Sequence, residues 1–207
     1  MFEPFIPSMK SYFQSFSAFL KSKQARPFVD VALFVIITFA VHKLWWQYSS
    51  YIYGIPVFMN ISGWLAYNVY LASVWINMHI LGMDIHLAEG NTMIFLRNNC
   101  SIYINESCSG FKQMFQILIL FVLFPGPWKH KLWFIPAAII SMFFVNVIRV
   151  IGLSYAMIYM PQHWDFIHLW IMRPFYYVAI FIMWVIWVEK FRNTHSKDAS
   201  ISSLPLK

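Results

Sequence analysis

Three side chains of this sequence combine the chemistry of a nucleophile, a base and a cation: Cys108, His168 and Arg149. Each lies in or beside an apolar run, and Cys108 stands where the polar stretch SIYINES turns into FKQMFQILILFVLF. A cysteine assisted by a nearby histidine is the activated nucleophile of acyl-transfer enzymes. A guanidinium beside them can stabilise a thiolate or the oxyanion of a tetrahedral intermediate. The three residues therefore predict cysteine-dependent acyl transfer, provided that the fold brings them together.

Cys108 is expected to open a helix that runs inward from the outer face of a membrane. A thiol at the start of a helix faces the positive end of the helix dipole, which favours the thiolate. Asn105 and Ser107 are candidate helix caps, and Ser109 leaves little bulk around the sulfur. Two alternatives stay open at this point, namely a small buried apolar cysteine and a disulfide with Cys100.

Arg149 is a charge inside an apolar run, where a charge costs at least about 2.5–3.5 kcal/mol at the membrane centre. At 1.5 Å per residue, it lies about 25 Å along a helix that starts at Leu132. Asn146 precedes it by one turn on the same helical face. The guanidinium can serve a site, or it can reach the outer headgroups or bond a neighbouring helix.

Two histidines are candidates for the base, and both fall in the stretch YMPQHWDFIHLWIMRP. His168 leads directly into the last apolar segment, and His163 is the alternative base. The ordinary role of a single histidine there is an interfacial anchor. Residue counts along three separate segments nevertheless place Cys108, Arg149 and His168 at similar depth in the membrane. This agreement favours one shared site.

The composition places the chain among integral membrane proteins. It has 207 residues, of which 60% are hydrophobic, 20% aromatic and 11% charged, more apolar surface than a soluble domain of this size can bury. The net charge of +7 comes from basic residues that flank apolar segments, which indicates membrane topology rather than a nucleic-acid partner. The histidines lack the spacing of a metal site, and the chemistry above needs no cofactor.

The predicted fold is an all-α integral membrane protein with four transmembrane helices, or five if residues 61–82 also span rather than lie in the interface. An outer-face β-hairpin is expected at 91–105, because period-2 runs surround a turn there. The single membrane domain, 28–190, lies between a cytoplasmic amphipathic segment, 1–27, and a cytoplasmic polar tail, 191–207. The predicted transmembrane helices are about 28–47, 108–124, 132–159 and 171–190.

The basic residues also predict an orientation. Lys and Arg gather at residues 10–26, at Lys129 and Lys131, and from Lys190 onward. If these regions are cytoplasmic, Cys108 and the 159–172 loop lie on the outer side. We therefore expect a multi-pass protein of the inner, cytoplasmic membrane with its site on the outer, periplasmic side.

The order Cys-Ser-Gly, then Asn-x-x-Arg, then a loop histidine before the last helix is similar to that of the exosortase/archaeosortase family. The resemblance covers residues 90–190 and includes the stretch FPGPWKHKLWFIP, which looks like that of small exosortase-like proteins. It implies a membrane cysteine peptidase or transpeptidase that cleaves C-terminal sorting signals of exported proteins. It also implies that Cys108 is the nucleophile, Arg149 the second catalytic residue and His168 the general acid and base. Asn146, Ser107 and Ser109 would support them.

The partners implied are the sorting-signal helix of an exported protein, the lipid bilayer, and an amine or lipid-linked acceptor. Two rival functions stay open. One is a purely hydrolytic membrane cysteine protease, and the other is a non-catalytic membrane scaffold or small transporter in which Arg149 and Asn146 only pack.

Overall fold

The computed structural model describes residues 25–192, and the fold is that of an all-α membrane protein with one small sheet, as predicted. Two terminal segments were predicted as cytoplasmic, 1–27 and 191–207. Their residues 1–24 and 193–207 lie outside the described residues. The helices are α2 (Arg26–Gly54), α3 (Pro56–His79), α4 (Phe111–Leu123), α5 (Trp128–Tyr159), α6 (Trp164–Phe166) and α7 (Met172–Trp187). The strands are β1 (Ile85–Ala88), β2 (Thr92–Phe95) and β3 (Cys100–Tyr103).

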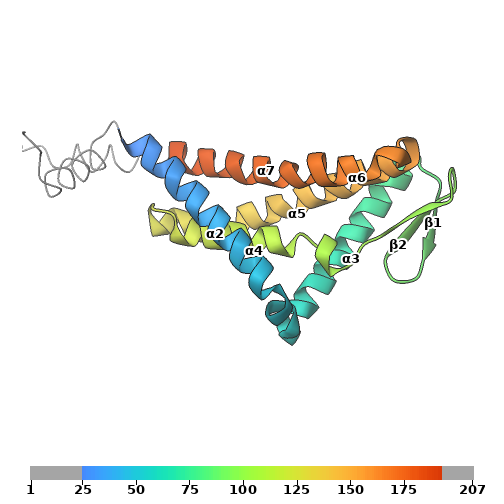
Figure 1. Cartoon of the computed structure of the whole chain (residues 1–207), viewed down its shortest axis with the longest axis horizontal. Coiled ribbons are helices and arrows are strands. Elements are labelled where there is room, and N and C mark those ends of the chain that lie inside the picture. Colours follow the sequence, from blue (N-terminus) through green and yellow to red (C-terminus); the bar gives the residue numbers. More distant parts are fainter. Residues whose placement is uncertain (1–24, 193–207) are drawn as a thin grey trace, which may run out of the picture.

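Helices α4, α5 and α7 run along the long axis of the molecule, and α2 and α3 meet in a V beside them (Figure 1). Contacts join α5 to α3, α4 and α7, so α5 is the central helix. The start of α2, the turn before α5 and the end of α7 lie at one end of the molecule, and the sheet and α6 lie at the other (Figure 1).

Three helical stretches of the described residues are long and apolar enough to cross a membrane: Arg26–Gly54, Trp128–Tyr159 and Pro161–Phe191. The helix predicted at 108–124 has 13 residues and covers about 20 Å, which is shorter than a bilayer core. It is short because Gly110, in a left-handed conformation, precedes it and the Pro-Gly-Pro turn follows it. Helix α3 fills the region that was expected to be interfacial or spanning, and its polar residues keep it out of the set of candidate spans.

The sheet is a three-stranded antiparallel meander in the order β1-β2-β3. The pair β2–β3, with Thr92 opposite Tyr103 and Phe95 opposite Cys100, occupies the region of the predicted hairpin. Strand β1 was not predicted, because its residues, Ile-His-Leu-Ala, do not show a clear alternation of apolar and polar side chains. The Asn98 side chain donates a hydrogen bond to the carbonyl of Met157 (2.8 Å), which ties the sheet to the end of α5.

Two hydrophobic clusters fill the interior. One lies among α2, α4, α5 and α7 and includes the fully buried Ile117, Phe121 and Trp187. The other lies among α3, the sheet and α5 and includes Val69 and Met93. Cys108 packs against the second cluster, and its loop leads directly into α4 of the first. The candidate site therefore lies where the two clusters meet.

Candidate active site

The loop that carries Cys108 is held by its own polar side chains. The Asn105 side chain accepts hydrogen bonds from the Ser107 backbone N–H (3.1 Å) and hydroxyl (2.7 Å). The buried Ser109 hydroxyl donates to the Glu106 carbonyl (2.6 Å) and accepts from the Phe111 N–H (3.1 Å). Ser107 and Ser109 therefore shape the turn around the cysteine.

Cys108 does not open α4, contrary to the expectation. It ends a 3-10 turn, Glu106–Cys108, and the α-helix begins at Phe111. The reason is Gly110, whose φ of +78° interrupts the helical path. A Cβ atom at Gly110 would lie 2.9 Å from Nδ2 of Asn146, so glycine also allows the loop to approach α5 closely.

Asn146 joins this loop to α5 and α7. Its Nδ2 donates a hydrogen bond to the backbone carbonyl of Cys108 (2.8 Å), and its Oδ1 accepts one from the hydroxyl of Tyr176. Asn146 is fully buried, so both bonds are shielded from water. The predicted supporting amide thus binds the main chain of the predicted nucleophile.

Arg149 and His168 are in direct contact, with Nη2 of the arginine 3.0 Å from Nε2 of the histidine. A guanidinium has donors only, so Nε2 accepts, and His168 in this arrangement is neutral with its proton on Nδ1. Arg149 is only 7% exposed, and its charge lies over the ring of Tyr176 at 5.4 Å. Arg149 is one helical turn from Asn146 on α5, and Asn146 is the residue that contacts the cysteine loop.

His168 lies in a π-helical turn, Ile167–Ile171, that leads into α7. Pro174 has no N–H for the carbonyl four residues earlier, and an irregular turn accommodates that loss. The Trp164 ring stacks on the imidazole at 5.6 Å. His163, the alternative base, is exposed in a preceding 3-10 turn, and within residues 25–192 it makes no side-chain contact with Arg149 or Cys108.

The two cysteines are free thiols, and Cys100 lies on β3. Within the described part of the chain, the Cys108 thiol makes no hydrogen bond, and it is half-buried. No group of three or more His, Cys, Asp or Glu side chains converges there in the manner of a metal site.

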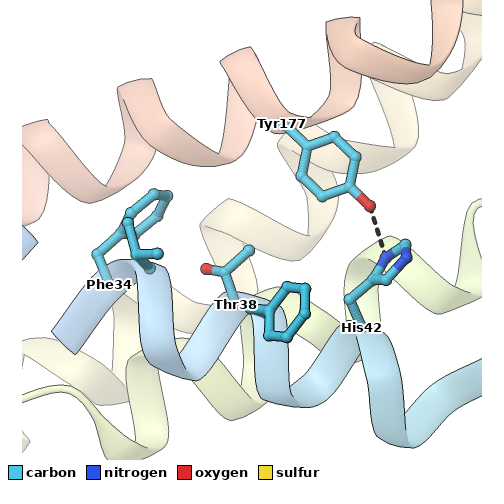
Figure 2. Close-up of a pocket in the computed structure, with 6 residues that line it drawn as sticks. Phe34, Thr38, His42 and Tyr177 are labelled. Atoms are coloured by element: carbon cyan, nitrogen blue, oxygen red, sulfur yellow. Dashed lines mark hydrogen bonds between the residues drawn. The ribbon is translucent and has the colours of Figure 1, made fainter. Parts of the chain in front are cut away.

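A groove of about 320 Å³ lies between α2 and α7. Figure 2 shows Phe34, Thr38 and His42 on α2 facing Tyr177 on α7. Trp46 donates to Nε2 of His42 (3.1 Å), so the neutral His42 ring carries its proton on Nδ1 and donates it to the Tyr177 hydroxyl (2.7 Å). Tyr177 follows Tyr176 in sequence, but Tyr176 is buried and Tyr177 is exposed, so the two side chains point in different directions from α7.

Two contributors to this site escaped prediction from the sequence. Tyr176 contacts Asn146 through its hydroxyl and Arg149 through its ring, yet a tyrosine in an apolar helix has no distinguishing pattern. Gly110 was visible as a small residue, but only the structure shows that Asn146 needs the space. A glycine two residues after a candidate nucleophile was the one available signal.

The fold and the site define a helical membrane protein in which Asn146 holds the Cys108 loop, one helical turn from a buried arginine that contacts a histidine. A family model described as transmembrane exosortase matches residues 44–188, which is well over half of the chain. The chain therefore belongs to the transmembrane exosortase family. The match begins farther toward the N-terminus than the resemblance at residues 90–190, so it also includes α3 and strand β1. No curated protein and no solved structure matches the chain.

Proposed function

We propose that this protein is a membrane cysteine peptidase or transpeptidase that cleaves C-terminal sorting signals of exported proteins through a thioacyl intermediate. Membership of the exosortase family indicates a sorting role of this kind. The observation that carries the assignment of residues is the Arg149–His168 contact, one turn from the amide that binds the Cys108 carbonyl. The proposed roles are nucleophile for Cys108, oxyanion stabiliser for Arg149 and general acid and base for His168.

The protonation of His168 controls Arg149 in this scheme. Neutral His168 accepts a hydrogen bond from Arg149 through Nε2. When the imidazole takes the proton of the Cys108 thiol, it becomes a cation and can no longer accept that bond. The guanidinium is then released toward the anion that forms beside it. Formation of the nucleophile and release of its electrostatic partner are thus one event.

The reaction follows from these roles. The Cys108 thiolate attacks the scissile carbonyl carbon, and the carbonyl electrons move to the oxygen, which Arg149 stabilises. The C–N bond then breaks as protonated His168 delivers its proton to the leaving amine, which leaves a thioester on Cys108. An acceptor amine, a lipid-linked group or water attacks that thioester with neutral His168 as base, and the thiol is restored.

The groove between α2 and α7 supports entry of the substrate helix from the bilayer. Its lining is mostly apolar, it is open, and α7, which forms one of its walls, also carries Tyr176 of the site. A sorting-signal helix there would lie parallel to α7. Its scissile peptide, just beyond the helix, would then reach Cys108.

The test uses exported proteins of the same cells that end in a transmembrane helix and a basic tail. Their C-termini are measured by mass spectrometry in cells that carry the wild type, Cys108→Ala, Arg149→Ala or His168→Ala. We expect Cys108→Ala and Arg149→Ala to abolish removal of the tail. We expect His168→Ala to reduce the rate of removal at least about 100-fold. Cys100→Ser is the matched control and should process normally.

Full processing by Cys108→Ala would refute the scheme. The mass of the new C-terminus also separates transfer from hydrolysis, because an added acceptor group appears only after transfer. If deletion of this protein from the cells changes no C-terminus, and the cells tolerate all three substitutions, the protein is a scaffold or transporter.

A further inference from the structure

Tyr176 occupies a position where three elements of the site meet. It projects from α7 and is only 4% exposed. Its hydroxyl donates to Asn146 Oδ1 on α5, and its ring lies under the Arg149 guanidinium. The hydroxyl is also near enough to Cys108 to interact with it electrostatically. No other described residue contacts both Asn146 and Arg149 by side-chain interactions of this kind.

The direction of the hydrogen bonds follows from the chemistry of the groups. The Cys108 carbonyl can only accept, so the amide nitrogen of Asn146 must face it. The amide oxygen then faces Tyr176, and the tyrosine hydroxyl must donate. A one-way series therefore runs from Tyr176 through Asn146 to the main chain of Cys108, and it works only with a hydroxyl at the first position.

We propose that Tyr176 is a positioning residue of this active site: it locks the Asn146 amide so that the Cys108 loop is held beside Arg149. The catalytic consequence rests on the proposed function above. Without the hydroxyl, Asn146 Oδ1 is buried without a donor, and its amide can rotate away from the Cys108 carbonyl. Because Tyr176 and His168 belong to the same continuous helical stretch, Pro161–Phe191, Tyr176 also sets the height of the cysteine loop relative to the base.

The first test needs no substrate, so it does not depend on the proposed function. The alkylation rate of Cys108 by a small neutral reagent is measured in the full-length protein in membranes, with Cys100→Ser in every variant. We expect Tyr176→Phe, which keeps the ring, to raise the rate about 5-fold, because a half-buried thiol is released with its loop. Tyr177→Phe is the matched control: it removes a neighbouring hydroxyl that bonds His42 instead, and it should leave the rate unchanged.

A double-mutant cycle with Asn146→Leu shows whether the hydroxyl acts through the amide. We expect Asn146→Leu to raise the rate by a similar factor, and addition of Tyr176→Phe to change nothing further. An unchanged rate in Tyr176→Phe, or factors that multiply in the double variant, would overturn the positioning role. Should Asn146→Leu fail to fold, the comparison of Tyr176→Phe with Tyr177→Phe decides alone.

The second test reads catalysis. For a sorting-signal substrate, Tyr176→Phe should lower kcat about 10- to 100-fold with KM unchanged, because the nucleophile is misplaced while the substrate site is intact. A rise in KM with normal kcat would contradict the proposal. Cys108→Ala could still process substrate while Tyr176→Phe and Asn146→Leu have non-additive effects on the alkylation rate of Cys108. In that case the proposed function fails and the link from Tyr176 to the Cys108 loop stands.

Discussion

At the scale of single residues, the neutral partner of Arg149 decides what its charge can do. A carboxylate in contact would neutralise most of the field of the guanidinium, and a substrate oxyanion would then gain little from it. His168 instead accepts a hydrogen bond without adding negative charge. Arg149 Nε, buried and without a hydrogen-bond partner within residues 25–192, leaves a further donor uncommitted. The site therefore keeps a desolvated positive charge ready for an anion, which suits acyl transfer.

Gly110 allows a prediction with a close control. Gly110→Ala imposes a side chain on a left-handed backbone, which costs roughly 1–2 kcal/mol, and it also pushes the new Cβ into Asn146. Gly82→Ala has the same kind of backbone conformation, φ +62°, but nothing lies within 4 Å of its Cβ. We expect Gly110→Ala to lower both the Tm of the purified protein and its processing activity, and Gly82→Ala to lower the Tm alone and by less. Equal effects of the two variants would mean that the close approach of Asn146 to Gly110 is unimportant.

At the scale of elements, the sequence predicted the apolar helices and the hairpin but misjudged where helices begin. Apolar runs show where a helix can exist, whereas its first residue depends on capping and on close contacts. Helix α5 begins at Trp128 rather than 132, because Pro127 fits immediately before a helix and buried Lys131 is held by α4. The contact between Arg149 and His168 could not be predicted, because depth along a helix says nothing of the face that meets a neighbour.

Lys131 provides the prediction at this scale. Its ammonium group donates to the carbonyls of Val122 (3.0 Å) and Phe124 (2.8 Å), and thereby caps the C-terminal end of α4. Lys131→Met keeps the approximate length of the side chain but removes both of these hydrogen bonds. We expect a loss of about 1–3 kcal/mol in stability, seen as a lower Tm. Lys129→Met, at an exposed position in the same turn of α5, should leave the Tm nearly unchanged. Equal Tm values for the two variants would contradict this role.

At the scale of the whole molecule, basic residues gather at one end and the sheet lies at the opposite end. Arg26 starts α2, Lys129 starts α5 and Lys190 follows α7, and these three points share one end of the molecule (Figure 1). His130 and Phe191 stack at 5.1 Å there, which joins the start of α5 to the turn after α7. The sheet lies at the other end. From the preference of basic residues for the cytoplasmic side, we expect the basic end to face the cytoplasm and the sheet to face outward.

Thiol labelling in intact cells tests that orientation. In a background of Cys100→Ser and Cys108→Ser, new cysteines are placed at exposed positions of the two ends, Ser101→Cys on β3 and Lys129→Cys at the start of α5. A membrane-impermeant reagent should label the first in intact cells and the second only after permeabilisation. The reverse pattern would place Cys108 on the cytoplasmic side, where exported substrates are not available to it. Between these two positions the chain contains α4, so labelling of both in intact cells would mean that α4 does not carry the chain across the membrane and that Lys129 lies on the outer side. Labelling on opposite sides is thus what the basic flanks and a site for exported proteins require together.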